Sequence, residues 1–180
     1  MSTDTNFMRY YWIMLLMLMM SCNDKVEKQI PDSVNWKKRK VEITNIDSLY
    51  KGNTYLSIYS EIYQRNEQSA HGLTATVSIR NPSTSDSIFI LNANYYNTKG
   101  NLIKNYFDHP IFLEPLETVE IVIDETDRQG GTGANFIFNW ATKKALVEPY
   151  FEAVMITTTH QQGISFITRG INKYNYVGNN

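Results

Sequence analysis

The segment with the clearest capacity for chemistry is 124–135, DETDRQGGTGAN, which combines three carboxylates with three glycines. Its candidate metal ligands are Asp124, Glu125, Asp127 and Asn135. Ca²⁺ binds about six to eight oxygen atoms, and carboxylates together with loop carbonyls can supply them. A calcium site is therefore one hypothesis for this segment. The interpretation that we favour is a loop whose glycines adopt positive φ and whose carboxylates are solvated.

A second candidate site consists of Tyr55, Tyr59 and Tyr63, which are spaced by four residues. Residues separated by an even number of positions lie on one face of an extended strand, and the intervening aliphatic residues lie on the other face. Exposed tyrosines would form an aromatic platform for a glycan or a peptide, because tyrosine offers a large amphipathic area with few rotatable bonds. We favour the alternative, in which the strand is covered on both sides and the rings pack inside.

Residues of the common catalytic types do not form a recognisable motif. His71, His109 and His160 lie far apart, without the spacing of a zinc site. Ser165 follows Gly163, but the second glycine of a nucleophile elbow is absent. We therefore expect a protein without catalytic activity, and the alternative is a hydrolase whose residues converge from several loops.

The N-terminal region contains an unbroken apolar run, Tyr10–Cys22, which follows Arg9 and ends at the only cysteine. About a dozen apolar residues are too few to cross roughly 30 Å of hydrocarbon, but they match the core of an export signal, which has about 7–15 residues. Cleavage after Ser21 would make Cys22 the first residue. An uncleaved membrane helix is the less favoured alternative.

The end of this run, LMMSC at residues 18–22, resembles the lipobox of bacterial lipoproteins. The resemblance implies that Cys22 receives diacylglycerol on its sulfur before cleavage, and later a further acyl chain such as palmitate on its new N-terminus. A second acyl chain makes membrane attachment long-lived. We therefore expect a lipid-anchored protein of the bacterial cell envelope, on its periplasmic or surface face.

The composition is that of one folded domain. The net charge does not produce an electrostatic field that would attract nucleic acid. The chain has 180 residues and a formal net charge of −1, which does not favour a polyanionic partner. We divide the chain into a signal peptide (1–21), the lipidated cysteine with a polar tether (22–48), a folded domain (49–172) and a C-terminal tail (173–180). A lipidated Cys22 leaves no thiol, so packing alone must stabilise the domain.

Short segments with alternating apolar and polar residues follow one another along the folded domain, and no segment has sustained helical periodicity. The clearest are 73–80, 88–96, 102–107, 119–123, 136–140, 151–159 and 164–169. Turn signals separate them, as at Asn81–Ser83 and Asn97–Asn101. About eight such strands predict an all-β fold, an antiparallel β-sandwich.

The segments 73–83, 95–102 and 113–116 resemble the strand and turn layout of immunoglobulin-like modules in exported bacterial proteins. The span from about Tyr55 to Gly170, including GTGANF at 131–136 and GISF at 163–166, resembles a family of uncharacterised bacterial lipoproteins known only as a domain of unknown function. That resemblance implies secretion and one domain, and it implies no activity.

These observations predict a lipid-anchored binding or interaction module of the cell envelope. Its expected partners are the membrane, through the lipid, and an unidentified envelope protein or glycan. We expect no nucleic acid and no cofactor. The alternatives are an envelope hydrolase and a calcium-dependent structural domain centred on 124–135.

Overall fold

The computed structural model describes residues 34–145, 147–157 and 163–177. The predicted signal peptide, Cys22, His160 and the tether up to residue 33 lie outside these residues. Within the part of the chain that is described, no helix has the length and apolarity needed to cross a membrane.

The described residues form twelve β-strands joined by turns and three 3₁₀ helices. The strands are β1 (Tyr50–Ile58), β2 (Glu61–Tyr63), β3 (Ala70–Gly72), β4 (Thr74–Arg80), β5 (Ile88–Tyr96), β6 (Leu102–Asn105), β7 (Ile111–Leu113), β8 (Thr118–Ile123), β9 (Ala134–Thr142), β10 (Tyr150–Thr157), β11 (Ile164–Arg169) and β12 (Ile171–Val177). The helices are η1 (Trp36–Arg39), η2 (Ile46–Ser48) and η3 (Gly131–Gly133).

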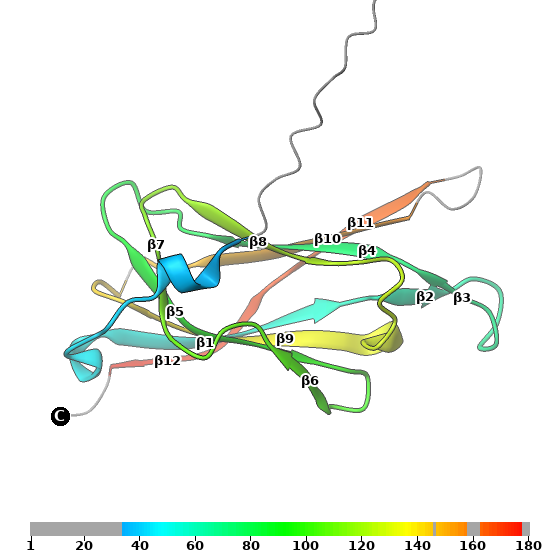
Figure 1. Cartoon of the computed structure of the whole chain (residues 1–180), viewed down its shortest axis with the longest axis horizontal. Coiled ribbons are helices and arrows are strands. Elements are labelled where there is room, and N and C mark those ends of the chain that lie inside the picture. Colours follow the sequence, from blue (N-terminus) through cyan, green and yellow to red (C-terminus); the bar gives the residue numbers. More distant parts are fainter. Residues whose placement is uncertain (1–33, 146, 158–162, 178–180) are drawn as a thin grey trace, which may run out of the picture. The chain divides into compact units, whose positions relative to one another are not determined.

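The strands make two sheets that face each other, and a short hairpin of β2 and β3 extends from one end (Figure 1). The six-stranded sheet has the order β12-β1-β9-β5-β6, with β7 also paired to β5. The four-stranded sheet has the order β11-β10-β4-β8. All pairings between these strands are antiparallel. The predicted all-β antiparallel sandwich is therefore confirmed.

The core lies between the sheets and is rich in stacked aromatic rings. Segment 136–140 alternates as predicted, and Phe136, Phe138 and Trp140 of β9 are all buried on the core face of the sheet. Phe138 stacks on Phe151 of the opposite sheet at 4.4 Å between ring centroids, and Phe136 stacks on Tyr95 at 4.9 Å. Burial of one such side chain contributes about 1.5–3 kcal/mol, so this column of rings ties the two sheets together.

Trp140 occupies a space that exists only because its neighbour on β1 has no side chain. Gly52 pairs with Trp140 across the β1–β9 ladder. A Cβ atom on Gly52 would lie 2.1 Å from Cζ2 of the indole ring. The ring instead lies against the strand, and its Nε1 donates a hydrogen bond of 2.9 Å to Oγ1 of Thr54.

One edge of the sandwich is closed where the chain changes sheets. β11 belongs to the four-stranded sheet and β12 to the six-stranded sheet, and Gly170 alone connects them. This crossing is visible as the orange to red ribbon in Figure 1. A Cβ on Gly170 would lie 2.6 Å from Cγ2 of Thr54 and 3.0 Å from Cβ of Phe151. The absence of a side chain thus allows β1 and β10 to approach at this corner.

Two segments differ from the sequence-based division of the chain. β12 continues to Val177 and pairs with β1, although residues 173–180 were expected to form a tail. Residues 34–48 were expected to belong to a tether, but they contact the sandwich. Trp36 packs on Phe107 at 5.2 Å, and Arg39 makes an ion pair of 2.7 Å with Glu117. An apolar indole ring within this polar stretch provides the reason for its docking.

Replacing Gly52 by alanine should lower the free energy of unfolding by about 2–3 kcal/mol, because the new methyl group overlaps the Trp140 ring. Urea unfolding followed by tryptophan fluorescence measures this change. Gly163→Ala is the matched control, since its Cβ would meet only Thr157 O at an ordinary 3.6 Å. Equal effects of the two substitutions would contradict the proposed packing of the indole ring.

Candidate functional site

A pocket of about 390 Å³ opens at the corner where the chain crosses between the sheets. Its lining comes from β1, β10, β12 and the segments before β5 and β10. The residues are Thr54, Pro82, Glu148, Pro149, Tyr150, Phe151, Gly170 and Asn172. Binding sites for small ligands have volumes of roughly 300–1,000 Å³, so the pocket can hold a small group or one side chain of a partner.

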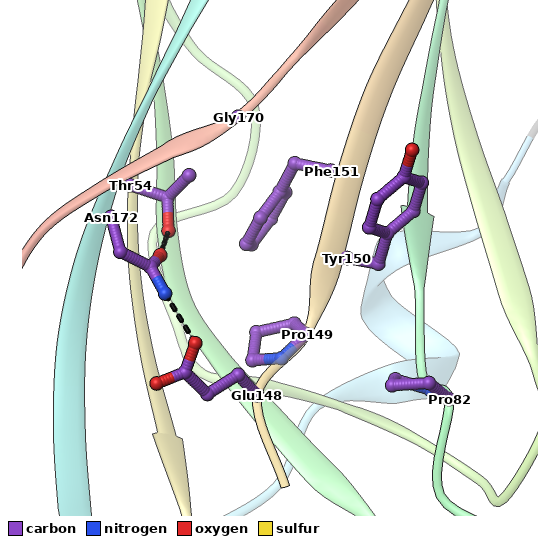
Figure 2. A pocket seen from close by; sticks show the side chains of 8 residues that line it. All are labelled: Thr54, Pro82, Glu148, Pro149, Tyr150, Phe151, Gly170 and Asn172. Carbon is purple, nitrogen blue, oxygen red and sulfur yellow. Dashed lines mark hydrogen bonds between the residues drawn. The ribbon is translucent and has the colours of Figure 1, made fainter.

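A chain of hydrogen bonds runs from the core to one side of this pocket, and Figure 2 shows its outer part from Thr54 to Glu148. The indole Nε1 of Trp140 donates to Thr54, whose hydroxyl donates to Oδ1 of Asn172 at 2.5 Å. Nδ2 of Asn172 then donates to the carboxylate of Glu148. In each of these bonds the inner residue donates to the next residue outward, so the series ends on the carboxylate acceptor of Glu148. Glu148 is therefore held in place by a series of bonds that begins at a buried ring.

The other side of the pocket is apolar and includes an aromatic ring. Figure 2 shows Tyr150 and Pro82 across from the polar residues, with Phe151 and Pro149 between them. The side chain of Tyr150 is not buried, since the residue is 38% exposed, and its hydroxyl donates to Oε2 of Glu152 at 3.1 Å. This bond restrains the orientation of the ring, which forms one wall of the pocket.

The pocket carries one negative charge. Among its lining residues, Glu148 is the only one with a charged side chain at neutral pH. The nearby carboxylate of Glu152 lies 4.0 Å from Arg80 and 3.9 Å from Arg169, which offset its charge.

Several carboxylates outside the pocket lining have shifted pKa values, and each shift has a local cause. A hydrogen bond from Arg39 lowers the pKa of Glu117, and a bond from the Thr126 hydroxyl lowers that of Asp124. Hydrogen bonds likewise lower the pKa values of Asp86, through Lys144, and of Asp108, through His109. Burial raises the pKa of Tyr106 to about 12. These carboxylates are held ionised by local partners, which is the opposite of what an acid catalyst requires.

Two of the four candidate calcium ligands, Asp124 and Asp127, accept hydrogen bonds within their own turns. Asp124 Oδ1 accepts from the backbone N and the hydroxyl of Thr126, at 2.8 and 2.7 Å. Asp127 Oδ1 accepts from the backbone N of Gln129 at 3.2 Å. Glu125 lies near Thr157, and Asn135 lies in β9. Within the described ranges, no three His, Cys, Asp or Glu residues are grouped so that they could hold a metal ion.

The glycines of this segment have a packing role. The carbonyl of Gly130 accepts bonds of 3.0 Å from both the backbone N and the hydroxyl of Thr98. A Cβ on Gly130 would lie 2.0 Å from the hydroxyl oxygen of Tyr95. Gly131 has a φ of 73°, and its carbonyl accepts from Ser60. The loop is therefore fastened across the ends of β1 and β5.

The structure does not bring the three candidate tyrosines together. Tyr55 lies in β1 opposite Ile137, on the outer face of the six-stranded sheet. β1 ends at Ile58, so Tyr59 leaves that face, and its ring packs against Phe166 of β11 at 5.6 Å. Tyr63 lies in the β2–β3 hairpin and is 56% exposed. The expected shared face required one continuous strand, and the break after Ile58 removes it.

The sequence did not point to the pocket residues Thr54, Glu148, Tyr150 and Asn172. Thr54 and Asn172 are 118 positions apart, and only the β1–β12 pairing makes them neighbours. The available local signal was Glu148 before a proline at a strand start, where the backbone is extended. That signal indicates geometry, and it carries no information about the partner of the carboxylate.

Comparisons with known proteins assign the chain to a family but do not assign an activity to it. A family model described as "Protein of unknown function (DUF3124)" matches residues 51–172, which confirms the predicted resemblance to an uncharacterised family. The chain is also similar to a solved protein described as "Crystal Structure of Thermotoga maritima 1070", with a TM-score of 0.43 and 8% sequence identity. That match covers 71% of this chain and 97% of the other. No curated protein matches the sequence.

Replacing Thr54 by valine should lower the free energy of unfolding by about 1–3 kcal/mol, because the buried indole Nε1 loses its acceptor. Urea unfolding measures the loss, and the indole N–H resonance of Trp140 should shift. Thr76→Val is the matched control, since Thr76 lies half-buried on the outer face of the four-stranded sheet and should change the value by less than about 0.5 kcal/mol. Similar losses in both variants would argue against the hydrogen-bond chain.

Proposed function

The chain belongs to the DUF3124 family of proteins of unknown function, and we propose that it is a lipid-anchored binding module of the bacterial cell envelope. Acyl chains on Cys22 hold the folded domain at a membrane, and the pocket beside Glu148 binds a partner there. The observation that carries the proposal is this pocket, in which a polar side fixed from the core faces an aromatic side.

The side chains that line the pocket are already held by hydrogen bonds, which favours binding. Ordering one flexible side chain on association costs about 0.5–1.5 kcal/mol. Asn172 bonds to both Thr54 and Glu148, and Tyr150 is restrained by Glu152. A partner therefore meets groups whose positions are largely set, and less of its interaction energy is lost in ordering them.

The pocket chemistry supports binding over hydrolysis. Hydrolysis by paired carboxylates needs a second carboxyl group close by and an acid whose pKa is raised. Glu148 is the sole carboxylate among the residues that line the pocket, and the lining contains no His, Ser or Cys. This set of groups can orient a ligand, but it supplies no acid and base pair.

The lipid anchor allows a pocket of low affinity to be occupied by its partner. Two or three acyl chains keep a protein at a bilayer for long periods. Confinement at the membrane raises the effective concentration of the pocket toward partners on the same surface. Modest affinity at this site is then sufficient for occupancy.

Lipidation is tested by growing cells with an alkyne-tagged palmitate. The wild-type protein should become labelled, and Cys22→Ser should lose the label because it lacks the acylated sulfur. Ser21→Ala keeps a small residue before the cysteine and should label like the wild type. Equal labelling of the wild type and Cys22→Ser would refute the anchor.

Binding at the pocket is tested with a photo-crosslinking residue, benzoylphenylalanine, in place of Tyr150 in the anchored protein. Illumination of growing cells should give a discrete adduct, which mass spectrometry can assign to a protein or a glycan. The control places the same residue at Tyr63, which is exposed on the β2–β3 hairpin. Absence of an adduct at position 150, or the same adducts at both positions, would rule out the pocket as the binding site.

A further inference from the structure

The turn between β7 and β8 carries an apolar residue at a position where glycine is usual. The backbone N of Glu117 donates to Glu114 O at 3.1 Å, which closes a turn with Pro115 in its second position. The third position is Leu116, whose φ is 60°. A type II turn requires positive φ at this position and therefore favours glycine there. Leucine rarely adopts such a backbone conformation, so the turn holds Leu116 at a conformational cost.

The side chain of Leu116 does not repay this cost by packing in the core. The residue is 67% exposed, and its neighbours Glu114 and Pro115 are exposed as well. A single exposed leucine is common on protein surfaces. At the tip of a turn with unfavourable φ, however, contact with an apolar phase would offset a cost that contact with water does not. Leu116 is therefore placed to contact an apolar partner.

One carboxylate joins this turn to the 3₁₀ helix η1. Oε1 of Glu117 accepts from Arg39 at 2.7 Å, and Oε2 accepts from the backbone N of Glu114 at 2.8 Å. The bond from Arg39 also lowers the pKa of Glu117, so the carboxylate is ionised at neutral pH. Residues 36–40 and 114–117 thus belong to one part of the surface, which we call the η1–turn surface.

The η1–turn surface has an excess of positive charge. Lys37, Lys38 and Lys40 are exposed, and within the part of the chain that the structure describes they form no ion pair. The ion pair that joins η1 to the turn is neutral. The three ammonium groups therefore outnumber the carboxylates of Glu114 and of nearby Asp108. Each lysine near an anionic bilayer strengthens binding by about fivefold.

The segment that leads to Cys22 joins the folded domain beside this surface. Val34 packs against the core directly before η1. Residues 23–33 separate it from Cys22, and a chain of this length spans at most about 40 Å. A lipid on Cys22 would therefore keep the η1–turn surface within about 40 Å of the bilayer. The β2–β3 hairpin lies at the other end of the sandwich (Figure 1).

We propose that the η1–turn surface docks on the bilayer that holds the lipid anchor, with Leu116 in the headgroup region and the lysines of residues 37–40 at anionic headgroups. This inference rests on the proposed anchor and adds the face by which the domain meets the membrane. The charge excess and the short connection to Cys22 both favour a lipid surface as the partner.

The test uses the ¹⁵N-labelled full-length protein, purified from membranes and reconstituted in nanodiscs that contain phosphatidylglycerol and a lipid with a nitroxide headgroup. The backbone amide signals of Lys38 and Leu116 should broaden, whereas those of Tyr63 and Glu67 in the β2–β3 hairpin should remain sharp. In nanodiscs of phosphatidylcholine with the same nitroxide lipid, the broadening should fall severalfold. Because this comparison uses the unaltered protein, it does not depend on how a variant folds.

A substitution at the turn separates docking from folding. Asparagine tolerates positive φ better than leucine does, so Leu116→Asn should not lower the free energy of unfolding. It should nevertheless reduce the broadening at Lys38, because the apolar contact is lost. Leu102→Asn changes another exposed leucine, in β6, and should leave the broadening as in the wild type.

The charge is tested by replacing Lys37, Lys38 and Lys40 together by glutamine. This variant should show the weak broadening of neutral nanodiscs even when phosphatidylglycerol is present. Lys99→Gln, in the exposed β5–β6 turn, should have no effect. Added salt should reduce the broadening of the wild type, since exposed charges are screened.

Equal broadening of the turn and hairpin signals would overturn the proposal, as would equal broadening at Leu116 in the two lipid compositions. Palmitate on Cys22 combined with no broadening at Leu116 would leave the anchor standing and remove only the docked face. Absence of palmitate on Cys22 would remove the anchor and this inference with it.

Discussion

The contact of the Trp140 indole ring with the bare backbone at Gly52 is the interaction on which the rest of this structure depends. The ring fills the space between the sheets because no side chain stands at position 52. Its Nε1 group must then find an acceptor in a buried place, since an unsatisfied buried donor costs about 1–3 kcal/mol. Thr54, two residues along the same strand, provides that acceptor. The packing of one large ring therefore fixes the first member of a polar series that ends at the surface on Glu148.

The same series of bonds links the core to the edge of the sandwich. Asn172 belongs to β12, the strand that reaches the six-stranded sheet only after the chain has crossed at Gly170. Sandwich corners are commonly made by strands that switch sheets at a bend. Here the bend places β1, β10 and β12 around a hollow, and it brings polar groups from β1 and β12 opposite the aromatic residue that begins β10. The pocket is thus a consequence of how the sandwich is closed.

Several of the candidate residues from the sequence analysis have structural roles. The acidic and glycine-rich segment closes its own turns and packs on Tyr95, and Tyr59 packs on Phe166. The pocket residues Glu148 and Tyr150 obtain their positions from hydrogen bonds to neighbouring side chains. Glu148 becomes a fixed acceptor through Asn172, and Tyr150 becomes a fixed aromatic wall through Glu152. These pairings are the structural basis of the binding function proposed above.

The sequence alone determined several of the strands and their buried faces. Segments 88–96 and 164–169 are strands with the bounds that alternation predicted, and the ring residues of β9 share the core as expected. Alternation is visible locally because side chains of an extended backbone point to opposite faces in turn. Only the tertiary structure decided that β1 lies between β9 and β12, that residues 34–48 dock on the sandwich, and that Thr54 meets Asn172. Strand order and pairing depend on contacts between residues that are far apart in the sequence, and the energies of these contacts cannot be inferred from any short segment. The pocket is formed by those contacts.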